Sequence, residues 1–127
     1  MIFWRVVFAL AAFFNLAVGI PLLLAPRQAV ASLVSGGPGD MVLAQILGVL
    51  ISVFGVGYGM VARDPQGNRG IAWLGVIGKL PLPVILWFYV RADLVPVRSM
   101  LLSLGDLGFA VLFVLFLWRT APAAGEA

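Results

Sequence analysis

Four polar side chains lie inside long apolar runs of this chain, and they are the candidates for binding or proton transfer within these runs. They are Asn15, Gln45, Lys79 and Asp106. A charged group in hydrocarbon costs at least ~2.5–3.5 kcal/mol on insertion scales, so such groups usually face a bundle interior. A lysine and an aspartate can neutralise each other, and side-chain amides can hydrogen bond between helices. We therefore predict that these four residues form one polar cluster, either structural or ligand-binding.

The runs that carry these residues are long enough to cross a membrane. The sequence is 63% hydrophobic and only 10% charged, whereas soluble domains are about half apolar and a quarter charged. The apolar runs cover about residues 2–24, 41–62, 71–90 and 99–118, each near the ~20 residues that a spanning helix needs. They lack the alternation of barrel strands. We predict an all-α integral membrane protein, a single domain over residues 1–120 forming an antiparallel four-transmembrane-helix bundle.

The connections between these runs differ in length and polarity. Residues 63–70 and 91–98 are short and carry turn residues, so the spans that they join should be neighbours. The longer link over 25–40 suggests a short interfacial segment between helices 1 and 2, opened by Pro26 and ended by the glycines of 36–39, with Asp40 capping the second span. One face of that segment would carry Ala29, Val30, Leu33 and Val34. Residues 121–127 are expected to form a disordered tail.

The first run could also be taken for a signal peptide. The tripeptide Ala29-Val30-Ala31 resembles a cleavage site. The apolar stretch before it is longer than the core of a signal peptide, and Arg5 is the one charge near its start. We expect an uncleaved first span.

Depth estimates at ~1.5 Å per residue bring the four polar residues toward one level. Lys79 lies ~12 Å and Asp106 ~18 Å from the same membrane face, a gap that the ~6 Å reach of a lysine can close. Asn15 at ~20 Å and Gln45 at ~24 Å lie slightly farther. Small residues recur on the same helix faces, at Ala12 and Gly19, at Gly48, Ser52, Gly55 and Gly59, at Gly75 and Gly78, and at Ser99, Ser103 and Ala110. Such stripes are typical of helix interfaces in lipid, which favours a shared interior.

Two prolines follow the lysine closely. Pro81 and Pro83 each remove a backbone donor, so the third span should kink or loosen just past Lys79. Broken helices beside an intramembrane charge often mark binding sites in transporters, although they also occur as packing features.

Aromatic and basic residues give a prediction of membrane placement. Residues near the span ends are interpreted as interface anchors: Tyr58, Trp73, Trp87, Tyr89 and Trp118. With the N-terminus inside, Arg5, Arg63, Arg69 and Arg119 lie on the cytoplasmic side, against Arg27, Arg91 and Arg98 outside. The positive-inside rule then favours cytoplasmic N- and C-termini.

Several function classes lack the residues that they need. The chain has no cysteine and no histidine, which removes thiol chemistry, histidine bases and the usual zinc and haem ligands. We find no acidic cluster suited to a metal, so no metal site is predicted. The arginines sit at span ends, as expected for lipid headgroups rather than nucleic acid. No catalytic residue can be assigned, and an enzyme would need a bound cofactor that the sequence does not identify.

A family resemblance covers most of the chain. Its residues are the glycine-rich segment from Leu47 to Tyr58, the segment from Ala62 to Pro65, Gly75 to Lys79, and Gly105-Asp106 to Leu117. These resemble small uncharacterised bacterial four-helix membrane proteins that are DoxX-like in architecture. The resemblance implies a bacterial inner-membrane location and an accessory role in redox complexes, and it assigns no catalytic residue.

The polar cluster leaves the function open between a few alternatives. One is an accessory subunit or lipophilic-ligand-binding protein, with the lipid bilayer and a membrane-protein partner or a second copy as its neighbours. The alternative is a small transporter or proton-coupled channel that works as an oligomer. The Lys79–Asp106 pair would be structural, ligand-binding or intermolecular in these cases.

Overall fold

A computed structural model of the chain describes residues 1–33 and 38–125. These residues form helices and connections, with no strand among them. The helices are α1 (Ile2–Leu24), α2 (Pro26–Leu33), α3 (Pro38–Arg63), α4 (Arg69–Lys79), α5 (Pro81–Arg91) and α6 (Ser99–Arg119). Four stretches are long and apolar enough to cross a membrane, namely α1, Asp40–Arg63, Arg69–Arg91 and α6. The prediction of an all-helical chain with four such stretches is confirmed.

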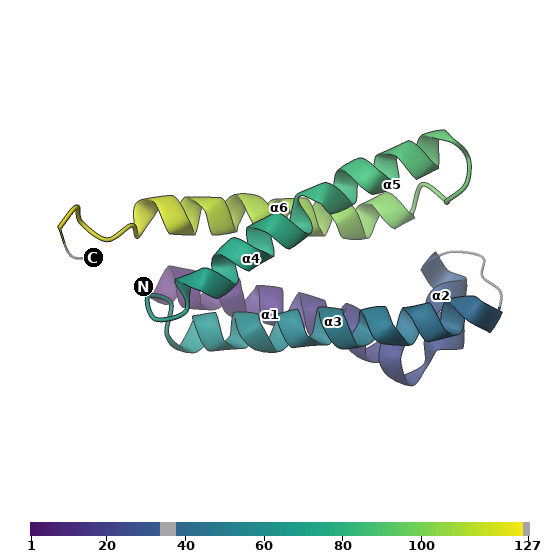
Figure 1. Cartoon of the computed structure of the whole chain (residues 1–127), viewed down its shortest axis with the longest axis horizontal. Coiled ribbons are helices and arrows are strands. Elements are labelled where there is room, and N and C mark those ends of the chain that lie inside the picture. The colour runs from purple at the N-terminus through teal and green to yellow at the C-terminus, as the bar shows by residue number, and fades with distance from the viewer. Residues whose placement is uncertain (34–37, 126–127) are drawn as a thin grey trace.

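Helices α1 and α3 lie side by side along most of their length, and glycines make this approach possible (Figure 1). A Cβ atom added to Gly48 would lie 2.7 Å from the backbone nitrogen of Leu23 and 2.8 Å from the carbonyl oxygen of Gly19. A Cβ atom on Gly55 would meet the side chains of Leu16 and Asn15. The small-residue stripes of the first and second spans therefore face each other, as is typical of close helix packing in lipid.

At the end of the molecule that holds the α3–α4 turn, the helices close around a compact aromatic core. Phe8 of α1 stacks on Phe113 of α6 with ring centroids 4.5 Å apart, and Tyr58 of α3 contacts Phe113 at 5.0 Å. Gly75 of α4 makes room for these rings, because a Cβ atom there would lie 2.9 Å from both the Tyr58 hydroxyl and the Phe113 ring. We call this region the closed half.

An arginine joins the α3–α4 turn to the end of α6. The guanidinium group of Arg69 donates to the carbonyl oxygens of Leu117 and Thr120, each at 2.8 Å, and lies 5.5 Å from the ring centre of Phe116. These carbonyls belong to the last turn of α6, where a cation also complements the helix dipole. Arg69 thus fixes the outer end of the closed half.

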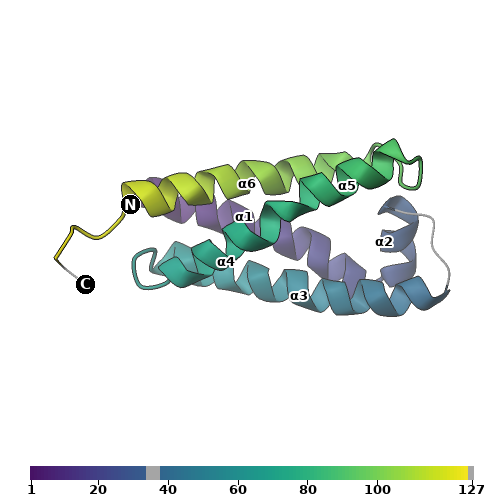
Figure 2. The same cartoon turned by 45° about the horizontal axis from the view of Figure 1, so that its top comes forward.

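The third apolar stretch is interrupted between α4 and α5, directly after Lys79. Pro81 and Pro83 have no N–H group, so the carbonyls one turn earlier lose their helical donors. Beyond the interruption at Leu80, α5 diverges from α3 and lies beside α6 (Figures 1 and 2). No residue of α5 is buried. The helix is interrupted past Lys79 as predicted, but Leu80 keeps helical angles (φ −64°, ψ −40°), and α4 and α5 continue in nearly the same direction (Figures 1 and 2).

The link between α1 and α3 contains α2, which Figure 2 shows lying across the end of these two helices. Val30 of α2 is buried against Leu22 and Ala44. The expected cap at Asp40 is wrong, because α3 begins at Pro38 and places Asp40 inside its first turn. Proline suits the first helical position, since its missing N–H would have no partner there. The predicted positions at 34, 36 and 37 lie outside the described residues.

The chain after α6 has no helix as far as Gly125. Residues 126–127 lie outside the described part, and disorder of this tail stays a prediction.

Candidate functional site

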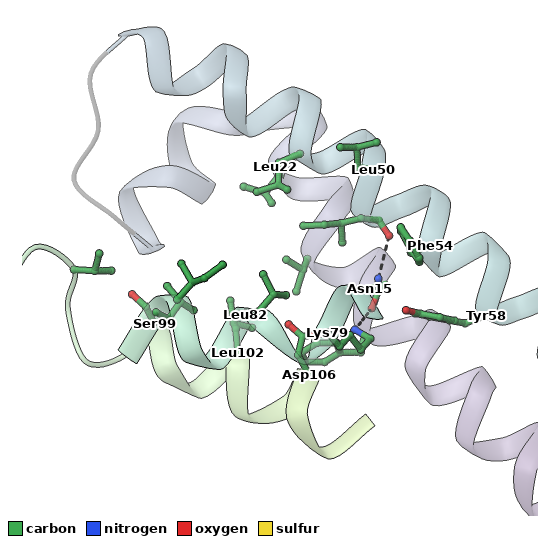
Figure 3. Close-up of a pocket in the computed structure, with 18 residues that line it drawn as sticks. Asn15, Leu22, Leu50, Phe54, Tyr58, Lys79, Leu82, Ser99, Leu102 and Asp106 are labelled. Atoms are coloured by element: carbon green, nitrogen blue, oxygen red, sulfur yellow. Dashed lines mark hydrogen bonds and ion pairs between the residues drawn. The ribbon is translucent and has the colours of Figure 1, made fainter. Parts of the chain in front are cut away.

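A hydrogen-bonded ion pair lies between α4 and α6, close to the break before α5. The ammonium group of Lys79 forms an ion pair with the carboxylate of Asp106, and it donates a second hydrogen bond to Asn15 Oδ1 at 3.0 Å. Asn15 in turn donates to the carbonyl oxygen of Ile51 at 3.2 Å. The side chains of Lys79 and Asp106 are only 5% and 16% exposed. The network therefore ties α1, α3, α4 and α6 together in the interior (Figure 3).

Aromatic rings surround the ammonium group. The Nζ atom of Lys79 lies 5.4 Å from the ring centre of Tyr58, 5.7 Å from that of Phe14 and 6.0 Å from that of Phe109. Ring faces carry negative potential and attract a cation at such distances, most strongly when water is excluded. The rings and the carboxylate together stabilise a charge that hydrocarbon alone would not.

The local sequence explains how each element presents its polar residue inward. On α6, Ser99, Ser103 and Ala110 are buried, and Asp106 follows the same helical spacing. On α4, the buried residues include Gly75 and Lys79, one turn apart. Small neighbours on both helices let the lysine reach the aspartate without a large side chain between them.

Next to this network lies a cavity of about 480 Å³, a volume within the usual range of ligand pockets. One end is polar and the remaining wall is apolar, with side chains from α1, α3, α5 and α6 (Figure 3). The polar end carries Asn15, Tyr58, Lys79 and Asp106, with Ser99 farther along. The apolar wall is formed by Phe14, Val18, Leu22, Leu47, Leu50, Ile51, Phe54, Leu82, Ile85, Leu86, Val95 and Leu102, with Gly78 beside Lys79.

The cavity lies where α5 diverges from α3 while remaining beside α6. Four of its lining residues on α3 and α5 are only half covered, with Leu47 and Leu50 exposed by 50% and 55%, and Leu82 and Ile85 by 40% and 50%. These residues mark the side on which the cavity opens. The space and its opening therefore lie where α5 is distant from α3 (Figure 1).

Three of the four predicted site residues come together, and the fourth does not. Gln45 is exposed and donates to the carbonyl oxygen of Leu23 at 3.0 Å, two turns along α1 from Asn15. It does not line the cavity. The prediction that Gln45 joins Asn15, Lys79 and Asp106 is wrong, because its amide reaches the backbone at the end of α1 instead.

One residue of the site was misread from the sequence. Tyr58, interpreted as an interface anchor, is 1% exposed, and its hydroxyl points toward Lys79 and Asn15 (Figure 3). Its spacing gave a signal, since Ile51, Phe54 and Tyr58 follow one another by three and four residues and share one helix face. Trp73, Trp87, Tyr89 and Trp118 are all at least 47% exposed, so their side chains are free to face a bilayer.

The described residues contain no group of three or more histidine, cysteine, aspartate or glutamate side chains that could hold a metal ion. The arrangement that they do contain is a charge-neutral, hydrogen-bonding end in an otherwise apolar cavity. Such a site can orient an amphiphilic molecule.

The fold and site define a small helical protein with four stretches able to cross a membrane. A scan of protein families, a search of curated proteins and a search of solved structures each find no match to this chain. The DoxX-like resemblance therefore stays a prediction.

Proposed function

We propose that this chain is an antiparallel four-helix protein of the inner (plasma) membrane that binds a lipophilic molecule in the cavity beside Lys79 and Asp106. The observation that carries the proposal is the combination of an enclosed ion pair with an apolar space that opens between α3 and α5. In a bilayer this opening faces acyl chains, so a hydrophobic molecule could enter sideways with its polar head first.

Insertion is supported by the outer surface of the helices. Large apolar side chains such as Phe13, Val53, Ile77 and Leu101 are 61% to 73% exposed. In water such contiguous apolar surface would cause aggregation, whereas in lipid it is the natural boundary. α2, lying across the bundle end, is placed to rest at the headgroup level.

Orientation with both termini in the cytoplasm is supported by the arginines. Figure 1 places the start of α1, the end of α6 and the α3–α4 turn at one end of the molecule, so Arg5, Arg63, Arg69 and Arg119 gather there. Because the chain has no cysteine, single cysteines can report the topology. Ala124→Cys should react with a membrane-impermeant maleimide only after cells are opened, and Asp93→Cys in intact spheroplasts; the reverse result would contradict this orientation.

The ligand proposal can be tested by identifying molecules that co-purify with the protein. Leu102 of α6 lines the cavity, so Leu102→Trp should obstruct it. Leu104 lies on the same helix, does not line the cavity and is 54% exposed, which makes Leu104→Trp a matched control. Mass spectrometry should detect a bound amphiphile in the wild type and in Leu104→Trp, and much less in Leu102→Trp. Equal amounts in all three would contradict the proposal.

The cavity favours binding over the alternative of transport. Its wall beyond the ion pair is almost entirely apolar, which suits a hydrocarbon chain and offers no series of polar groups for an ion or proton. An accessory role beside a membrane-protein partner or a second copy agrees with ligand binding, since a bound amphiphile could be passed to a neighbour. pH-dependent flux through protein reconstituted in liposomes would favour the transport alternative.

A further inference from the structure

The charges at the polar end of the cavity cancel each other. Among the described residues that line it, Lys79 and Asp106 are the two charged ones, and they are already paired. An ionised head inserted here would bring a net charge with no countercharge into a dry region. The effective cost of burying an uncompensated ion is several kcal/mol. The site is therefore suited to an uncharged head.

The hydrogen-bonding groups at this end further restrict the chemical type of the head group. The Tyr58 hydroxyl lines the cavity and can donate one hydrogen bond. Asp106 has a second carboxylate oxygen besides the one that Lys79 contacts, and carboxylate oxygens only accept. A hydroxyl group can accept from the tyrosine or donate to the carboxylate, whereas a ketone or ester can only accept and leaves that carboxylate oxygen without a donor.

The rest of the cavity limits the size and number of hydrocarbon chains in the ligand. The apolar wall extends from Lys79 and Asp106 toward Leu22 and Ser99, about 10 Å along α1 and α6. A volume of about 480 Å³ accommodates one hydrocarbon chain and is too small for a two-chain phospholipid. The half-exposed leucines of α3 and α5 let the far part of such a chain extend into the bilayer.

We propose that the cavity binds a single-chain amphiphile with an uncharged hydroxyl head, held at the polar end that Tyr58 and Asp106 line, with its tail along α3 and α5. This inference rests on the proposed ligand-binding function and specifies its substrate class. Fatty alcohols and isoprenoid alcohols share this chemistry.

The experiment measures binding of four probes to the full chain in lipid nanodiscs, with empty nanodiscs subtracted. The probes have the same chain length and differ in their heads: dodecanol, dodecylsulfonate, dodecyltrimethylammonium and headless dodecane. Binding is followed as displacement of radiolabelled dodecanol. Dodecanol should bind at least ~10-fold more tightly than either ionic probe, a difference of about 1.4 kcal/mol.

Variants test the placement of the head. Tyr58→Phe should weaken dodecanol about 2- to 10-fold, the usual net value of one hydrogen bond, and leave dodecane unchanged. Tyr89→Phe is the matched control, since Tyr89 is 50% exposed and does not line the cavity. Asp106→Asn leaves Lys79 unpaired and should shift the preference toward dodecylsulfonate, and Lys79→Gln should shift it toward dodecyltrimethylammonium.

The outcomes separate this inference from the function on which it rests. If the wild type binds none of the probes, both are wrong. If an ionic probe binds as tightly as dodecanol, or if Tyr58→Phe has no effect, the hydroxyl assignment alone is wrong and ligand binding stands. The ranking of probe affinities in the wild type and the effect of Tyr58→Phe test the hydroxyl assignment even where a charge variant does not fold.

Discussion

Both ends of this bundle are built from apolar helices, yet one end is closely packed and the other contains a cavity. In the closed half, Phe8, Phe113 and Phe116 are fully buried, and the ring centre of Phe8 of α1 lies 4.5 Å from that of Phe113 and 5.0 Å from that of Phe116, both of α6. In the hollow half, which contains the cavity, α5 buries no residue. Hydrophobic composition alone therefore does not decide how closely the helices pack. The direction in which α5 runs relative to α3 and the sizes of the facing side chains also matter (Figure 1).

The ion pair lies at the boundary between the halves and serves both. Lys79 is the last residue of α4, so it belongs to the closed half by its backbone and reaches the cavity by its side chain. Asn15 binds it from α1. We expect this boundary to be the most sensitive part of the molecule, because each charge depends on the other to stay out of hydrocarbon.

Breaking the ion pair should have the largest effect. Lys79→Met leaves Asp106 unpaired and should destabilise the protein by about 3–5 kcal/mol, and Asp106→Leu should do the same. The double variant should recover most of the loss, because no lone charge is then buried. Denaturant titrations in detergent measure all three. Additive losses in the double variant would show that the charges do not interact.

Truncating a large side chain should have the next largest effect, and the loss of stability should differ between the two halves. Phe113→Ala removes a fully buried ring and should cost about 3 kcal/mol, the lower end of the usual range, because packing rather than water exclusion drives association in lipid. Leu86→Ala enlarges a cavity that already exists and should cost less than about 1 kcal/mol. Thermal unfolding in detergent compares them. Equal losses would mean that the hollow half is as tightly packed as the closed half.

Adding one methyl group should then test the α1–α3 contact. Gly48→Ala places a Cβ atom against the backbone of α1 and should destabilise by about 1–3 kcal/mol. Gly59→Ala is the control on the same helix, since a Cβ atom there meets nothing within 4 Å. Its stability should stay the same or rise slightly, because alanine favours helix. A tolerated Gly48→Ala would show that the helices can separate without cost.

Restoring a continuous helix should have the smallest effect on stability and a clear effect on binding. Replacing Pro81 and Pro83 together by alanine returns two backbone donors, so α4 and α5 can form one continuous helix and α5 can approach α3. We expect a stability change below about 1 kcal/mol and weaker binding of the amphiphile, measured in nanodiscs. Unchanged binding would show that the cavity does not depend on the break.

Much of the fold could be predicted because lipid imposes simple rules. Span length fixed the helix positions within a few residues, and Pro81 and Pro83 located the interruption of the third span. Asp40 was misassigned because a proline two residues earlier can begin a helix equally well.

The site was harder to predict, because spacing identifies a helix face but not the neighbour that it meets. Gln45 shares a stripe with Gly48 and Ser52, yet its long side chain reaches the backbone at the end of α1. Tyr58 was assigned to the interface from its place near the end of a span, while its helix face directs it inward. The cavity could not be foreseen, because it depends on how far α5 diverges.

In the proposed function, a lipophilic molecule enters the hollow half and stops at the ion pair. The most direct measurement is photo-crosslinking in nanodiscs with an alkyl probe that carries a diazirine in its chain, with the labelled residues mapped by mass spectrometry. The account predicts adducts at Leu50, Leu82 and Leu102 that excess unlabelled probe suppresses, and none at Phe113. Labelling confined to outward residues such as Val53 and Leu104, without competition, would contradict it.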